Sequence, residues 1–170
     1  MATAFLTLEK RAGPISADGY ERVLAIASTL LFVAALTAIA RGWAEWAQVP
    51  ALIWLHLLSV LLATGLTPVI LLRRRGDRRH RLLGQVWALA MLATALLSLG
   101  IHESGPARWS PIHLLSLFTL LMVPRLWWTA RHHEVAKHRR AVRGFVTGAL
   151  VIAGFFTCPF GRLLGHWLFA

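Results

Sequence analysis

The fold is decided by residues 51–72, ALIWLHLLSVLLATGLTPVILL, together with the basic stretch RRRGDRRHR that follows at residues 73–81. The first stretch contains no Asp, Glu, Lys or Arg, and its 22 residues are enough for a helix to cross a hydrocarbon layer of about 30 Å. The second stretch belongs at the polar surface of a membrane. Together they predict a membrane-spanning helix that ends in a basic loop.

Four further segments have the same apolar character. The five predicted spans are residues 23–40, 51–72, 82–101, 111–130 and 145–160. Hydrophobic residues make up 57% of the 170 positions, which is more than a soluble domain of this size can bury. No linker is long enough to separate two domains. We therefore expect an all-α integral membrane protein with five transmembrane helices, in which a cytoplasmic segment (residues 1–22) precedes one helical domain (residues 23–170).

The basic residues orient this domain. Fourteen of the 18 Lys and Arg lie in residues 1–22, 73–81 and 131–143, which the five spans place on one side. Arg41, Arg108 and Arg162 lie on the other side. The positive-inside rule then predicts a cytoplasmic N-terminus and an external C-terminus. Because the net charge of +11 is divided among short loops, we expect anionic lipid headgroups as partners and no nucleic acid.

A repeat links the second and fourth spans. His56-Leu57-Leu58-Ser59 recurs as His113-Leu114-Leu115-Ser116, and each copy is followed by a His-Arg step, 24 residues after His56 and 25 residues after His113. These steps are His80-Arg81 and His138-Arg139. The matched offsets predict that helices two to five form a four-helix bundle around the histidines, with the first helix packed peripherally.

The four histidines predict a cofactor. An imidazole within an apolar span is costly to desolvate without a partner. His56 and His113 lie at similar depth on helices of the same direction, and His80 and His138 lie at the cytoplasmic starts of helices three and five. A b-type haem needs two facing imidazoles and an apolar slot. We therefore expect haem b at these pairs, with His56 and His113 preferred, by analogy with membrane cytochromes that pass electrons across a bilayer.

Two alternatives stay open. His102 and Glu103 end the third span, and with His56 and His113 they supply three imidazoles and a carboxylate, a set suited to zinc, copper or iron on the outer face. In the other alternative the imidazoles donate to carbonyl groups or lipid phosphates. The chain is then a cofactor-free accessory or structural protein, whose apolar surface a second copy or a larger membrane complex covers.

The sequence offers few signs of an enzyme. No Gly-rich phosphate loop and no Ser/His/Asp arrangement stands out, and Cys158 is the only cysteine, so neither a disulfide framework nor a thiolate metal cluster is available. We therefore assign no catalytic residue.

Several motifs between His56 and Arg162 resemble the bacterial membrane-protein family called domain of unknown function 2306. They are Arg78-Arg79-His80-Arg81-Leu82-Leu83-Gly84-Gln85-Val86-Trp87, Ile101-His102-Glu103, Ser110-Pro111-Ile112-His113-Leu114-Leu115-Ser116, His138-Arg139-Arg140, Arg143-Gly144 and Phe160-Gly161-Arg162-Leu163. Where the family often has Met before the Arg-Gly step, this chain has Val142, a change that leaves the histidines in place. The resemblance implies a bacterial inner-membrane protein and no particular reaction.

Overall fold

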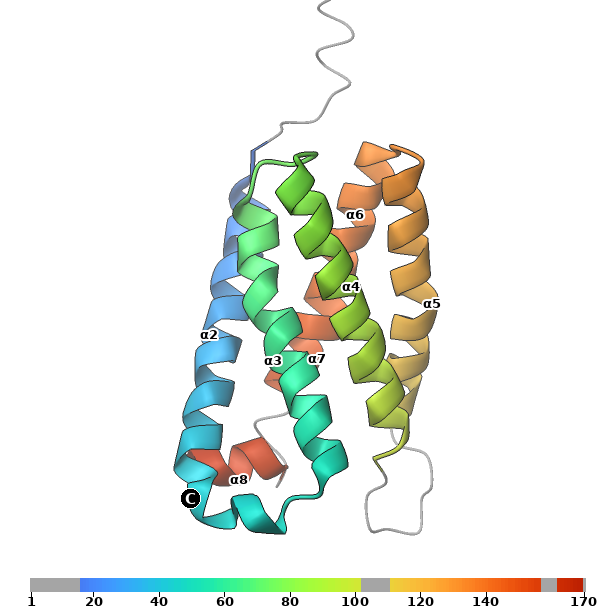
Figure 1. Ribbon diagram of the computed structural model, residues 1–170. Helices are drawn as coiled ribbons and strands as arrows, with labels where there is room; N and C mark the ends of the chain where they lie inside the picture. Colours follow the sequence, from blue (N-terminus) through green and yellow to red (C-terminus); the bar gives the residue numbers. More distant parts are fainter. Residues whose placement is uncertain (1–15, 102–110, 157–161, 170) are drawn as a thin grey trace, which may run out of the picture.

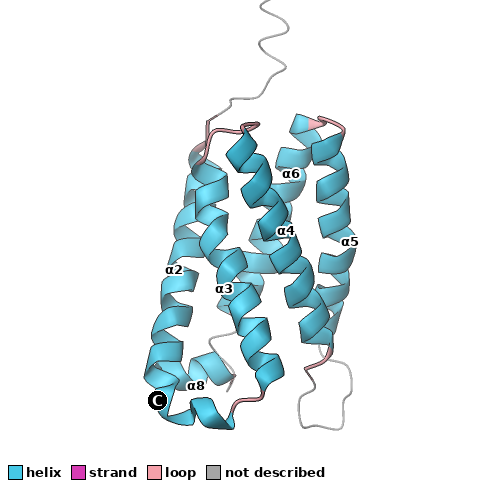
Figure 2. Cartoon of the chain, viewed as in Figure 1, coloured by secondary structure: helices cyan, strands magenta, loops and turns pink. Residues whose placement is uncertain are grey.

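The computed structural model describes residues 16–101, 111–156 and 162–169, and the regular structure in these ranges is helical (Figure 2). The elements are α2 (Gly19–Arg41), the 3-10 helix η1 (Gly42–Gln48), α3 (Ala51–Leu72), α4 (Arg78–Leu99), α5 (Pro111–Arg131), α6 (Val135–Phe145), the π-helix η2 (Val146–Ile152), α7 (Ala153–Phe155) and α8 (Leu163–Phe169). The long helices run side by side, and α8 lies across one end beside the C-terminal end of α2 (Figure 1).

The helices agree with the first four predicted spans. Within the described ranges, three segments are long and apolar enough to cross a membrane: Gly19–Gln48, α3 and α4. The fourth predicted span, residues 111–130, is the helix α5. The fifth, residues 145–160, is divided among η2, α7 and residues that lie outside the described ranges. A helical membrane protein is confirmed, while the count of five spans stays a prediction.

Capping side chains set the starts of two helices. Asp18 accepts a hydrogen bond from the backbone N–H of Glu21 (3.1 Å), and Glu21 accepts one from the N–H of Asp18 (3.1 Å), so a capping box begins α2. Asp77 caps α4 in the same position and accepts from the N–H of His80. The turn before it needs Gly76, whose φ is +83°. Both helices begin at the same end of the bundle (Figure 1).

The long helices from α2 to α6 each pack against the next one in sequence, and α2 also contacts η2 and α8. The core joins α4, α5 and the α6–η2 segment through Trp87, Met91, Val123, Phe145 and Val146. Many large apolar side chains on the outer surface stay exposed, as expected for side chains that face lipid.

The first helix differs from its predicted peripheral position. Leu24 and Ala25 belong to the same core cluster as the other helices, and Ser28, one turn further on, is fully buried. These residues form one buried face of α2, which a uniformly apolar sequence does not reveal. The polar contacts of Glu21, described below, hold this face against the bundle.

Candidate functional site

His56, in the second turn of α3, takes part in a small polar network. Nδ1 of His56 lies 3.2 Å from the backbone oxygen of Thr94 on α4, and the Thr94 hydroxyl donates to Oγ of Ser59 (2.8 Å). Because a carbonyl only accepts, this contact requires a proton on Nδ1 and leaves a lone pair on Nε2. The network ties α3 to α4 within their apolar spans.

His113 lies near the start of α5 and is 7% exposed. Ser116 and Thr119 are buried on the same side of the helix, at steps of three residues. The neighbouring helices also carry buried polar side chains, Thr64 and Thr67 on α3 and Ser98 on α4. The pairing of His56 with His113 remains a prediction.

The alternative metal set is not described in full, because His102 and Glu103 lie outside the described residues. Among those that are described, no group of three or more His, Cys, Asp or Glu side chains is close enough to hold a metal ion. The outer metal site therefore stays an expectation from the sequence.

His138 and His80 both lie at the arginine-rich end of the bundle. Nδ1 of His138 lies 3.0 Å from the carbonyl oxygen of Leu126 and 3.3 Å from the hydroxyl of Thr129. His80 lies in the first turn of α4, within electrostatic range of His138. Nδ1 of His80 is buried and makes no hydrogen bond to any described residue.

The surroundings of His138 favour the neutral ring. Burial lowers the pKa of His138, the Leu126 carbonyl partly offsets this effect, and the positive charge of Arg75 lowers the pKa further. With its proton on Nδ1, the neutral imidazole presents Nε2 as a lone-pair donor. This is the form that binds metals.

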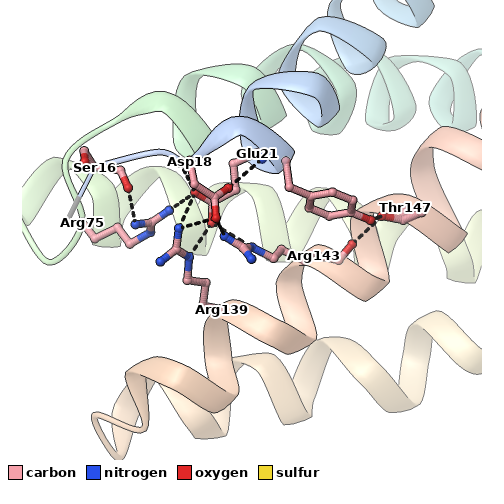
Figure 3. A network of polar contacts seen from close by, with 8 residues as sticks. Ser16, Asp18, Glu21, Arg75, Arg139, Arg143 and Thr147 are labelled. Atoms are coloured by element: carbon pink, nitrogen blue, oxygen red, sulfur yellow. Dashed lines mark hydrogen bonds and ion pairs between the residues drawn. The ribbon is translucent and has the colours of Figure 1, made fainter. Parts of the chain in front are cut away.

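A buried ion cluster that the sequence pattern does not predict lies at the same end of the bundle (Figure 3). Glu21 is 2% exposed, and its carboxylate accepts two hydrogen bonds from Arg139, at 2.8 and 3.0 Å, and one from Arg143 at 3.2 Å. Arg75, in the loop between α3 and α4, also pairs with Glu21 and donates to the carbonyl of Ser16 (2.9 Å). One carboxylate thus joins the start of α2, the α3–α4 loop and α6.

Asp18 is the second acid of this cluster. It pairs with Arg143 and, at 3.1 Å, with Arg139. The backbone N–H of Glu21 and the guanidinium of Arg143 lower the pKa of Asp18, so the carboxylate stays ionised. Next to it, the Tyr20 hydroxyl lies 2.6 Å from Oγ1 of Thr147, and the guanidinium carbon of Arg143 lies 5.7 Å from the Tyr20 ring centroid.

From the sequence alone, the arginines in the loops indicate the orientation in the membrane and contacts with lipid. The available signal for the cluster was the pair Asp18 and Glu21, three residues apart at the basic end of an apolar helix. Such spacing indicates a capping box, but it does not show which of the many arginines face the two acids. Arg75 links the cluster to the inner histidines, because its charge acts on both His80 and His138.

Long apolar helices, apolar side chains on the outer surface and basic helix ends define the class, an α-helical membrane protein. The model of the predicted membrane protein family DUF2306 matches residues 53–158, more than half of the chain, and the chain belongs to this family. No curated protein and no solved structure matches it. The matched region contains the four histidines and the three arginines of the cluster, whereas Asp18 and Glu21 precede it.

Proposed function

We propose that this protein binds b-type haem between α4 and α6, with His80 and His138 as axial ligands, and that it carries electrons in the bacterial inner membrane. The contact between Nδ1 of His138 and the Leu126 carbonyl supports this proposal most directly. A metal-bound histidine nearly always donates its other ring N–H to a carbonyl, a carboxylate or water, which fixes the tautomer and the ring plane. His138 is held in this way, with Nε2 as the remaining nitrogen.

The surroundings of His80 also suit a haem. A buried polar atom without a hydrogen bond costs about 1–3 kcal/mol, and Nδ1 of His80 is such an atom within the described part of the chain. The charges of Arg73 and Arg75 act on His80, and such cations suit the propionate groups of a haem. At Gly84, one turn along α4, no heavy atom lies within 4 Å of the position a Cβ would take, so a flat group could approach the helix backbone there.

When bound, haem would supply one-electron redox chemistry whose potential depends on its ligands and on nearby charges. The residues of this chain would hold two imidazole nitrogens in place, and the arginines would stabilise negative charge at this end. The contact of His56 with the Thr94 carbonyl extends the proposal to the outer pair, His56 and His113. Two sites at opposite ends of the bundle would allow an electron to cross the membrane, with the arginine-rich end in the cytoplasm beside anionic lipid.

A second candidate is the cofactor-free accessory or structural protein. It is favoured by the filling of the core, where the rings of Trp87 and Phe145 meet edge to face at 5.8 Å between α4 and α6. In this case the carbonyl contacts of His56 and His138 serve only to tie neighbouring helices together. The two candidates predict different spectra.

The test is an absorption spectrum of protein produced with an ample haem supply and purified in detergent. The haem proposal expects a six-coordinate low-spin b-type spectrum, from which His80→Ala and His138→Ala each remove the signal of one haem per chain. His132→Ala is the matched control, because His132 is exposed and stacks on Trp128 outside the bundle. A colourless wild-type protein, or a haem content that neither inner substitution lowers, would contradict the inner site.

A further inference from the structure

A hollow lies at the end of the bundle away from the arginine cluster. It has a volume of about 410 Å³ and lies between the end of α2, η1 and α8. Its lining residues are Ala40, Arg41, Gly42, Trp43, Ala44, Glu45, His166 and Trp167. The volume falls within the range of about 300–1,000 Å³ that is usual for small-molecule sites.

The wall of this hollow is built around Trp167, which is 3% exposed. Its indole N–H donates to Oε2 of Glu45 at 2.8 Å, and a Cβ on Gly42 would overlap with its ring. Glycine at position 42 therefore lets the indole lie directly on the backbone between α2 and η1. Trp167 also belongs to a cluster of indole rings, because the Trp54 ring centroid lies 6.3 Å from that of Trp167 and 5.4 Å from that of Trp46.

An acidic and a basic side chain, Glu45 and Arg41, both line the hollow. Glu45 keeps 44% of its side chain exposed while one oxygen holds Trp167, and Nε2 of His166 lies 3.5 Å from the other. A carboxylate has about four acceptor positions, so it still has capacity for a cationic donor. Arg41, one helical turn before Glu45, lines the same hollow and carries the guanidinium that best matches a phosphate.

We propose that this hollow binds the headgroup of phosphatidylethanolamine, with the ammonium at Glu45 and the phosphate at Arg41. A primary ammonium donates three hydrogen bonds and gains from aromatic faces, whereas a trimethylated ammonium donates none. Trp43 is 71% exposed at the rim, where tryptophan lies at the level of lipid headgroups. Val33 and Leu36 on α2 and Phe169 on α8 are exposed apolar side chains on the same two elements, available to the acyl chains.

The experiment is native mass spectrometry of the purified protein with an equimolar mixture of dioleoyl phosphatidylethanolamine, phosphatidylcholine and phosphatidylglycerol. We expect the ethanolamine lipid to be retained preferentially. Glu45→Gln keeps an oxygen that accepts from Trp167 but removes the charge, and a lost charge-assisted hydrogen bond should reduce the preference about tenfold. Arg41→Gln should weaken retention of all three lipids, because all three carry the phosphate.

The control is Glu134→Gln at the opposite end of the bundle, which should leave the preference unchanged. Because the readout is a ratio of lipids bound to the same variant, partial loss of folded protein does not imitate the effect. Equal retention of the three lipids, or a preference that survives Glu45→Gln, would overturn the proposal. Soluble O-phosphoethanolamine provides the last arm. If it displaces the lipid at equal concentration, the site recognises the free zwitterion and the lipid assignment is wrong.

Discussion

Replacing Glu21 by Gln tests the ion cluster with a minimal change of shape. The side chain is 2% exposed and accepts from Arg139 and Arg143, while it also pairs with Arg75. Breaking a buried ion pair by removing one partner costs about 3–5 kcal/mol. Here the arginines keep 15–26% of their side chains exposed, and two of them keep Asp18 as a partner. We therefore expect a loss of about 3 kcal/mol, the lower end of that range.

The assay is reversible unfolding in mixed micelles, followed by far-UV circular dichroism. The matched control is Glu134→Gln, which removes a carboxylate from an exposed pair with Lys137 at 2.8 Å. Exposed pairs contribute about 0–1 kcal/mol, so the control should change stability little. Equal losses in the two variants would refute the buried cluster as the tie between α2, the α3–α4 loop and α6.

Three further predictions concern single contacts. The hydrogen bond from the Glu21 N–H is the main cause that lowers the pKa of Asp18 below its usual value of 3.8. The ionised carboxylate therefore stabilises the fold above pH 3.8, and this stabilisation is lost as the pH falls below that value. The difference in melting temperature between wild type and Asp18→Asn should accordingly shrink below about pH 4. The Trp87 indole N–H donates to the Thr67 hydroxyl at 2.9 Å in the core. Thr67→Val should lower the free energy of unfolding by about 1–3 kcal/mol in the wild type and by clearly less in a Trp87→Phe background. An equal loss in both backgrounds would contradict this hydrogen bond. In a Cys158→Ala background, a cysteine introduced at Gly76 in the basic loop should react with a membrane-impermeant thiol reagent only in inside-out vesicles. Labelling of this cysteine in intact cells whose outer membrane has been removed would reverse the proposed topology.

Apolar runs with sharp polar ends were predicted well from the sequence. The structure has α3 at Ala51–Leu72, as predicted, and α5 ends one residue beyond the predicted span. In contrast, α4 begins at Arg78, four residues before the predicted span, because Asp77 supplies an N-cap that hydropathy does not register. The fifth span was predicted as one apolar segment, and nothing in its composition indicated the π-helix at Val146–Ile152.

The candidate site was only partly predictable for a similar reason. The offsets in the repeat identified four histidines, but not the carbonyl groups of Thr94 and Leu126 that orient two of them. Glu21 meets arginines that are 54, 118 and 122 residues away in the chain. With 18 basic residues in the sequence, only the packed helices determine which of them face the buried carboxylate.

The most direct test of the central claim is a titration of haem into the purified apo-protein, followed by its absorption spectrum and by the bound haem per chain. We expect saturation at one or two haems per chain, with the first in a low-spin form whose ligands are two imidazoles. We also expect the double variant His80→Ala/His138→Ala to lose one equivalent of haem and still to elute as a folded protein. A wild-type protein that binds no haem above the level of nonspecific partition into detergent would contradict the claim.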